Sequence, residues 1–306
     1  MTAAFRTPRI TWSQRARLVA TSALAGSLSL ALVTNAYAIP GDGVVVAGQA
    51  VISVTAPGAL VINQTTANAA INWRSFSIGQ GESVQFVQPD AHSVALNRVL
   101  GADPSVILGR LSANGQVFLV NPNGVLFGTT AQVNVGGLVA STLQIRDADF
   151  MAGRYSFSDA GPGAVDNRGS IVADGGSVAL LGGQVNNTGV ISARLGSVTL
   201  AAGSAMTLDV AGDGLLKVTV DAGAVDALAE NGGLIQADGG RVLMTARSAG
   251  ALLRTAVNNT GVISARLGSV TLAAGSAMTL DVAGDGLLNV TVDAGALDAL
   301  AENGGL

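Results

Sequence analysis

The stretch that decides the fold is Val185–Leu234, VNNTGVISARLGSVTLAAGSAMTLDVAGDGLLKVTVDAGAVDALAENGGL, because it occurs a second time as Val257–Leu306. The copies lie 72 residues apart and differ at two of their 50 positions. The two differences are Lys217/Asn289 and Val225/Leu297. Repetition at a fixed spacing is the sequence signature of a solenoid, in which each unit stacks on its neighbours.

A shorter pattern, Asn-x-Gly-x-Ile-x-Ala, lies inside and before this repeat. It begins at Asn167, Asn187, Asn231 and Asn259, with spacings of 20, 44 and 28 residues. We interpret these spacings as coils of roughly 20–24 residues, within the range of known solenoid repeats. On that basis the 72-residue repeat is expected to contain three coils.

The asparagine that begins each pattern has two interpretations. We favour a turn residue whose side chain bonds to the backbone and stacks coil on coil. The alternative is N-glycosylation, whose acceptor motif N-x-[ST] occurs at four positions. These positions are Asn63, Asn186, Asn258 and Asn289.

The residues between the glycines predict strands. VISA, SVTLAA, MTLDV and KVTV alternate apolar with small or polar residues at a period of two, and glycine-rich corners separate them. No aromatic residue follows Phe157 and no proline follows Pro162. A narrow lumen favours stacked aliphatic side chains over aromatic ones. A strand that lies between two others uses its backbone amides as hydrogen-bond donors, and proline has none. The fold class is therefore all-β, a parallel β-helix.

The amino-terminal segment has the pattern of a secretory signal peptide. Four arginines precede the first acidic residue, an apolar run of 16 residues covers 18–33, and Ala36-Tyr37-Ala38 forms an A-x-A site. We expect residues 1–38 to be removed by cleavage between Ala38 and Ile39. A membrane anchor is the alternative, but the apolar run is shorter than the ~20 residues that span a bilayer.

The composition excludes several function classes. Cys 0 and His 1 exclude thiol nucleophiles and multi-histidine metal sites. Removal of residues 1–38, which hold four arginines and no acid, would change the net charge from −4 to −8, so nucleic acid is not expected as a partner. His92 lacks a nucleophile motif such as G-x-S-x-G, and is interpreted as a loop residue. Carboxylates such as Asp221 and Glu230 recur in both copies. A catalytic pair needs one unique site, so the repeated carboxylates are not expected to be catalytic. We therefore expect the protein not to be an enzyme and to have no metal or cofactor.

Residues 71–142 contain a second set of motifs. In order, they are Asn72-Trp73 with Phe76, Val84-Gln85-Phe86, Asn97-Arg98-Val99, Ile107-Leu108-Gly109, Asn121-Pro122-Asn123-Gly124-Val125 and Gly137–Thr142. This stretch closely resembles the filamentous-haemagglutinin-type secretion domain of two-partner secretion exoproteins. One departure is that the family's Asn-Pro-Asn-Leu motif is absent. Asn97-Arg98-Val99-Leu100 lies near its place, as in the high-molecular-weight adhesin subgroup.

The resemblance implies a right-handed β-helix and a route of export. Family members cross the inner membrane through the general export machinery, and an outer-membrane β-barrel transporter recognises the secretion domain. Asn121, Pro122, Asn123 and Gly124, and more loosely Asn97 and Arg98, match positions linked to secretion competence. The residues themselves also predict a tight Asn-Pro-Asn-Gly turn after the strand 117–120, so a structural role stands beside direct partner contact.

The expected organisation is a signal peptide (1–38), an amino-terminal secretion domain that caps the β-helix (39–160), and β-helix repeats (161–306, with copies at 185–256 and 257–306). The resemblance predicts a secreted or surface-displayed exoprotein of a Gram-negative bacterium, with an adhesin role directed at host-cell or bacterial surface receptors. The alternative is the front part of a contact-dependent inhibition toxin, with its effector domain beyond Leu306.

Overall fold

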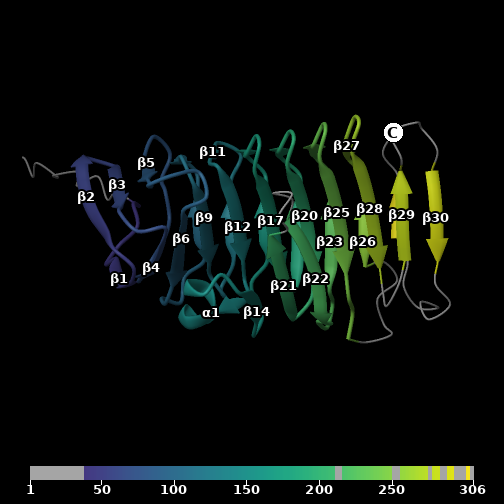
Figure 1. Ribbon diagram of the computed structural model, residues 1–306, viewed down its shortest axis with the longest axis horizontal. Coiled ribbons are helices and arrows are strands. Elements are labelled where there is room, and N and C mark those ends of the chain that lie inside the picture. Colours follow the sequence, from purple (N-terminus) through teal and green to yellow (C-terminus); the bar gives the residue numbers. More distant parts are fainter. Residues whose placement is uncertain are drawn as a thin grey trace, which may run out of the picture. The chain divides into compact units, whose positions relative to one another are not determined.

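The computed structural model describes residues 38–210, 216–249, 256–274, 278–282, 288–292 and 301–303. Strands wind in successive coils, and a complete coil contributes one strand to each of three sheets (Figure 1). We call these sheets 1, 2 and 3 in the order in which each coil enters them. The expected all-β parallel β-helix is confirmed.

Sheet 1 consists of β2 (Ala50–Ala56), β3 (Ala59–Gln64), β5 (Ser83–Val87), β8 (Arg110–Ala113), β11 (Gln132–Asn134), β16 (Ser170–Val172), β19 (Val190–Ser192), β24 (Leu234–Gln236) and β27 (Val262–Ser264). Sheet 2 consists of β1 (Val44–Ala47), β4 (Asn68–Trp73), β6 (Val94–Val99), β9 (Gln116–Val120), β12 (Gly137–Ser141), β17 (Ser177–Gly182), β20 (Ser197–Ala202), β25 (Arg241–Ala246), β28 (Ser269–Ala274), β29 (Met278–Val282) and β30 (Leu288–Val292). Sheet 3 consists of β7 (Ser105–Ile107), β10 (Val125–Phe127), β15 (Val165–Asn167), β18 (Gln184–Asn187), β23 (Leu228–Asn231), β26 (Val257–Asn259) and β31 (Ala301–Asn303).

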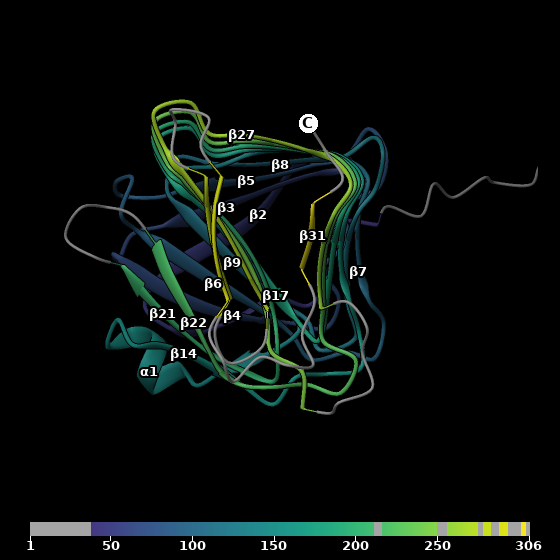
Figure 2. The ribbon, with the colours of Figure 1, turned by 90° about the vertical axis from the view of Figure 1, so that its right-hand side faces the viewer.

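The three sheets surround a common interior (Figure 2). Stacked aliphatic side chains fill this lumen. In sheet 1, Ile171 pairs with Ile191, which pairs with Ile235, so identical side chains lie one above another. Each coil alone could bury only part of its apolar face, and stacking buries the rest. Toward the amino-terminal end the lumen also holds Trp73 and Phe76, whose rings meet edge to face at 5.5 Å.

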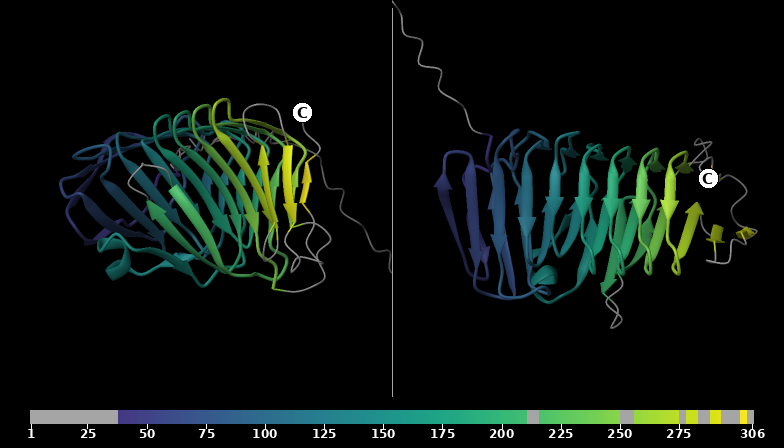
Figure 3. Two further views of the ribbon diagram at one scale, coloured as in Figure 1. Left: turned by 45° about the vertical axis from the view of Figure 1, so that its right-hand side comes forward. Right: turned by 90° about the horizontal axis from the view of Figure 1, so that it is seen from above.

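Two antiparallel strands close the amino-terminal end of the coils. β1 pairs antiparallel with β4, and β2 pairs antiparallel with β3, whereas the pairs that link the following coils are parallel (Figure 3). Residues 43–73, which include both cap strands, contain no charged side chain. Val51 on β2 is 63% exposed. The cap therefore covers the first coil but presents uncharged strand edges of its own.

The expectation that the 72-residue repeat contains three coils is wrong, because it contains two. Asn187 pairs directly with Asn231, and Asn231 with Asn259. The 44-residue spacing is one coil enlarged by a hairpin, β21 (Ala205–Val210) and β22 (Leu216–Ala222), which leaves the β-helix after β20 and returns at β23. Spacing alone could not distinguish two short coils from one coil with an excursion.

This hairpin joins a fourth, antiparallel sheet on the outer face of sheet 2. The order in this face sheet is β13 (Gln144–Ile145), β14 (Tyr155–Ser158), β21 and β22, with helix α1 (Asp147–Met151) beside it (Figure 2). Between the face sheet and sheet 2 lies a second hydrophobic core, which includes Phe118, Phe150 and Phe157. Where the face sheet covers it, sheet 2 thus packs apolar side chains on both faces.

The equivalent hairpin of the second copy occupies a different place. β29 and β30 pair with each other as β21 and β22 do, but β29 also pairs antiparallel with β28 and so extends sheet 2. Nearly identical sequences therefore form the same hairpin, and the surroundings decide which sheet it joins.

Candidate functional site

The corner formed by Asn121–Gly124 connects β9 to β10. Asn121 is fully buried; its Nδ2 donates to the Asp103 carbonyl and to Ser105 Oγ, both at 3.0 Å, and its Oδ1 accepts the Asn123 amide at 3.0 Å. The Gly124 amide donates to the Asn121 carbonyl at 3.0 Å, and Gly124 has a φ of 120°, a region that favours glycine. The sequence predicted this tight turn correctly.

The same corner bonds to the coils on either side of it. Asn123 Nδ2 donates to the Gly101 carbonyl of the preceding coil at 2.9 Å, and the Gly163 amide of the following coil donates to the Pro122 carbonyl at 3.1 Å. A Cβ at Gly161 would lie 2.1 Å from that carbonyl oxygen, so the following coil fits only without a side chain there. The corner therefore fixes the register of three successive coils.

Asn97 lies in the lumen, on β6. It is fully buried; its Oδ1 accepts the Trp73 indole N–H at 3.0 Å, and its Nδ2 donates to the carbonyls of Ala95 and Phe118 at 3.2 and 3.3 Å. A buried indole needs an acceptor, and Asn97 supplies it. In the folded protein the side chain of Asn97 is therefore inaccessible to a partner.

Arg98, the next residue, faces the opposite side of sheet 2. Its guanidinium donates to the Ile145 carbonyl at 2.5 Å, bonds to Asn72 Oδ1 at 3.3 Å, and pairs with Asp147 Oδ1 at 2.7 Å. Arg98 thus connects sheet 2 to β13 and to the start of α1. It also lies near the corner, because Arg98 pairs in register with Val120, the residue before Asn121. The predicted secretion residues accordingly gather at one end of two adjacent strands.

The asparagines of the repeat form a buried ladder through sheet 3. Asn167 Nδ2 donates to Asn187 Oδ1 at 2.7 Å, Asn187 Nδ2 to Asn231 Oδ1 at 2.7 Å, and Asn231 Nδ2 to Asn259 Oδ1 at 2.6 Å. The stacking interpretation is confirmed, but the main partners are side chains of neighbouring coils rather than backbone. The turn that follows also uses the Asn167 Oδ1, which accepts the Gly169 amide at 3.2 Å.

The four candidate glycosylation sites differ in exposure. Asn63 is exposed on sheet 1. Asn186 and Asn258 donate to carboxylates of the preceding coil, Asp166 and Glu230, each at 3.1 Å. The side chain of Asn289 lies outside the described part of the chain. Modification at any of these sites stays a prediction.

The interpretation of His92 as a loop residue fits its place in the structure. His92 is exposed in the turn between β5 and β6, and its backbone N–H donates to Asp90 Oδ1 at 2.8 Å. The Ser93 hydroxyl and the His92 amide, which both bond to this carboxylate, lower the pKa of Asp90. Among the described residues, no group of three or more His, Asp or Glu side chains could hold a metal ion.

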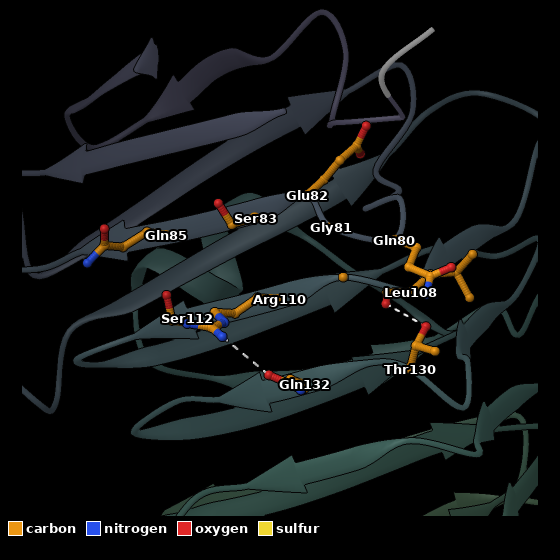
Figure 4. A pocket seen from close by; sticks show the side chains of 11 residues that line it. Gln80, Gly81, Glu82, Ser83, Gln85, Leu108, Arg110, Ser112, Thr130 and Gln132 are labelled. Atoms are coloured by element: carbon orange, nitrogen blue, oxygen red, sulfur yellow. Dashed lines mark hydrogen bonds between the residues drawn. The ribbon is translucent and has the colours of Figure 1, made fainter. Parts of the chain in front are cut away.

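A polar pocket of about 800 Å³ lies on the outer face of sheet 1 (Figure 4). Its lining comes from the loop before β5 and from β5, β8 and β11, and includes Gln85, Ser112 and Gln132. Arg110 Nη2 bonds to Gln132 Oε1 at 3.4 Å across it. Glu82 lies at one end, and its carboxylate accepts two backbone amides rather than a side chain. Sequence reasoning missed Glu82, since no motif marks a carboxylate whose partners are backbone amides.

Of the expected cleavage site, the structure describes Ala38 and Ile39, whereas Ala36 lies outside the described residues. Ala38 is exposed, Ile39 is half-buried, and Pro40 is buried. The repeated acidic residues Asp213, Asp285, Asp293 and Asp298 also lie outside the described residues. Within the part of the chain that the structure describes, no helix is both long and apolar enough for a membrane crossing.

Comparison with known families gives a match over most of the chain: residues 36–290 match the family of the TPS secretion domain. The chain belongs to this family. TPS stands for two-partner secretion, so the chain is part of an exoprotein that is exported across the outer membrane.

The chain is similar to the following relatives and solved structures. Two heme/hemopexin-binding proteins of Haemophilus influenzae are 48% and 42% identical to the chain over 108 and 111 residues; these segments cover 35% and 36% of the chain and 12% of each relative. The HMW1 secretion domain from Haemophilus influenzae is 34% identical, with a TM-score of 0.67 over 77% of this chain and 62% of that one. A filamentous hemagglutinin secretion domain is 16% identical, with a TM-score of 0.48 over 78% and 95%. The chain thus spans about an eighth of the curated relatives that it matches.

Proposed function

We propose that this chain is an adhesin-like exoprotein, secreted or displayed on the cell surface, and that a dedicated outer-membrane β-barrel recognises its amino-terminal secretion domain during export. Membership of the TPS secretion domain family supports the route. The general export machinery would carry the chain across the inner membrane, and the signal peptide of residues 1–38 would be removed there. The matched relatives support a role in secretion. They do not support a shared ligand, because the similarity covers only 12% of the length of each relative.

The observation that carries the proposal is the corner at Asn121–Gly124. The residues of the corner form hydrogen bonds with each other and with the two neighbouring coils. The motif therefore acts first by allowing the coils to stack in register. Pro122 and Asn123 are half-buried and are the residues of the motif that can also touch a partner. For Asn97 we propose a folding role alone, since its side chain is enclosed in the lumen.

Secretion by cells that contain the barrel partner tests this function. The Asn121→Ala/Asn123→Ala double variant should be synthesised normally but should fail to appear outside the cells. Loss of the Asn121 amide leaves buried groups unpaired, at a cost of about 1–3 kcal/mol each. Asn134→Ala is the matched control, because Asn134 is an exposed asparagine at the end of a strand in the next coil. Normal secretion of the double variant would remove the motif from the mechanism.

The adhesin role is supported by the repetition of the outer surface. Arg194-Leu195 and Arg266-Leu267 present the same dipeptide at equivalent corners two coils apart, and the leucines are 73% and 95% exposed. A ligand that engages several equivalent weak sites gains apparent affinity of roughly 10²–10⁴-fold without new contacts.

Retention on host or bacterial cells tests this role. A mature chain truncated after Ala256, which lacks the second copy, should be retained less than the chain 39–306 when both are immobilised at equal density on beads. Equal retention would contradict the adhesin proposal. It would leave the toxin alternative, for which a separate effector region would have to be found.

A further inference from the structure

The Glu82 carboxylate binds the backbone amide of Ala38, the first residue that the structure describes. The residue lies just before β5, and its side chain is largely enclosed, with 9% of the residue exposed. Its Oε2 accepts the Gly79 amide at 2.6 Å, and its Oε1 accepts the Ala38 amide at 2.8 Å, across 44 residues of sequence. Figure 4 shows Glu82 at the end of the polar pocket, apart from Gln85 and Ser112. The pocket side chains do not use this carboxylate.

The amide at Ala38 is the one that signal-peptide removal would eliminate. Hydrolysis of the Ala38–Ile39 bond consumes one water and leaves a carboxylate on Ala38 and a protonated amine on Ile39. Ala38 departs with the signal peptide, so Glu82 Oε1 loses its donor. The new amine cannot move far, because Pro40 is buried and the Gly41 amide donates to the Ser75 carbonyl at 2.9 Å. Consecutive Cα atoms are 3.80 Å apart, so the Ile39 amine lies within about one residue length of the vacated position.

We propose that Glu82 is the binding site for the mature amino terminus, and that cleavage replaces the hydrogen bond from the uncharged Ala38 amide by an ion pair between the Ile39 ammonium and the Glu82 carboxylate. This inference rests on the cleavage site within the proposed function. Pro40 has no N–H, so Ile39 supplies the only backbone donor before Gly41. The amide offers the carboxylate one donor and no charge, whereas an ammonium offers three donors and a full positive charge.

Other charges around this segment are few. Asp42 and Arg74 pair with each other at 2.5 Å, and Arg110, on the strand next to β5, bonds to Gln132. These groups are unchanged by substitution of Glu82. The Glu82→Gln variant keeps an oxygen for the Gly79 amide and removes the negative charge, so it isolates the charge of the carboxylate.

The composition allows a direct measurement. After removal of residues 1–38 the chain has two amines, the α-amine and the exposed Lys217. Reductive methylation with ¹³C-formaldehyde of the processed full chain therefore gives two sets of methyl resonances, which can be titrated separately. In the wild type the α-amine should titrate with a pKa above its ordinary range of about 7.7–8.0. In Glu82→Gln its pKa should fall back to that range, while the Lys217 resonances should titrate identically in both proteins.

Two results would overturn the inference. One is an α-amine pKa that is the same in the wild type and in Glu82→Gln. The other is amino-terminal sequencing that places the first residue of the exported protein anywhere but Ile39. Both are distinguishable from failure of the proposed function, because secretion of the same variants is measured separately. If the protein is secreted but shows no pKa difference, the ion pair is contradicted and the proposed function is not.

The thermal midpoint supplies a further readout. Glu82→Gln should lower the Tm of the processed chain by roughly 3–6 °C, a shift typical of the loss of one strong interaction in a chain of this size. A chain that retains an extension before Tyr37 has a neutral amide at residue 39, and the same substitution should lower its Tm less. An equal decrease in both chains would count against the ion pair.

Discussion

At the scale of single residues, asparagine has three distinct tasks in this fold. Asn121 closes a corner, Asn97 accepts the Trp73 indole in the lumen, and Asn187 bonds to its counterparts in the coils on both sides. A buried amide costs free energy unless both its donor and its acceptor find partners. The stacked coils meet this requirement by placing the next asparagine at hydrogen-bond distance.

Replacement of Asn187 by Ala should destabilise the protein by about 2–4 kcal/mol, because it removes two ladder bonds and leaves one donor and one acceptor unpaired. Asn186→Ala is the matched control. Asn186 is the adjacent residue on β18, but its side chain is half-buried and bonds to Asp166 instead. Urea unfolding of both variants measures the difference. Equal losses would show that the ladder contributes nothing beyond local packing.

The ion pair between Asp174 and Arg194 gives the stability a small dependence on pH. The Arg194 guanidinium donates to the Asp174 carboxylate and lowers the pKa of that carboxyl below its ordinary value. Because the folded pKa is the lower one, the stabilisation is complete above the unfolded value, near 3.8, and is lost as the pH falls through the folded pKa.

We expect Asp174→Asn to reduce stability at pH 7 by no more than about 0.5 kcal/mol, since the pair is largely exposed to solvent, and this loss to shrink as the pH falls through the folded pKa of Asp174. Unfolding at a series of pH values measures this effect. A loss that grows as the pH falls would contradict the assigned direction.

The stacking of the ladder asparagines and the tight turn at the corner were predictable from the sequence. The face of β6 from which the Asn97 side chain projects was not. Residues 94–99, VALNRV, place two apolar residues and one polar residue on each face of β6, because one face lines the lumen and the other lies under the face sheet. Alternation therefore could not show which face Asn97 joins. Its partner Trp73 lies 24 residues away, in the preceding coil.

At the scale of elements, the face sheet and its aromatic cluster distinguish this protein from a bare solenoid. Phe118 on β9 contacts Phe150 of α1 and Phe157 of β14, with ring centroids 5.9 and 6.4 Å apart. The strands of the hairpin β21–β22 were predictable from period-two patterning. Their place outside the β-helix was not, because the partner strand β14 lies about 50 residues earlier in the sequence and the alternation fits a coil equally well.

Phe157→Ala should destabilise the face sheet by roughly 3–5 kcal/mol, the usual cost of removing a buried phenylalanine ring. The three main sheets have their own core, so the loss should be local. Hydrogen exchange should accelerate in β14, β21 and α1 and stay unchanged in β20. Met151→Ala is the control, since Met151 on the same helix is partly exposed and should have little effect. Uniform acceleration throughout the chain would show that the two cores unfold together.

At the scale of the whole β-helix, the coils follow one another without a break from the cap to the second copy of the repeat. The repetition and the absence of aromatic residues beyond Phe157 predicted this architecture. The cap was expected from the family resemblance, but its antiparallel pairing was not, since β1 and β2 read from sequence like any other strands. Unpaired edges usually carry charged residues or proline that prevent pairing between molecules, and β1 and β2 carry neither.

Val51→Lys should therefore reduce concentration-dependent self-association of the mature chain, because a lysine at an exposed edge opposes strand pairing between molecules. The matched control is Val190→Lys. Val190 is an outward-facing, exposed valine on β19, which has a strand on each side in sheet 1. Sedimentation at several concentrations measures the association. If Val190→Lys reduced it as strongly as Val51→Lys, overall charge and not the edge would be responsible.

The coils close at unequal intervals of sequence, which has a consequence for the proposed export. If the barrel of the proposed function admits only extended chain, a coil that has closed outside the cell cannot pass back through it. A coil closes after 20 residues between Asn167 and Asn187, but only after 44 residues between Asn187 and Asn231. Within that 44-residue interval the hairpin β21–β22 pairs with itself and with β14, a strand that precedes it in the sequence. The hairpin would therefore oppose backward sliding in an interval in which no coil has yet closed.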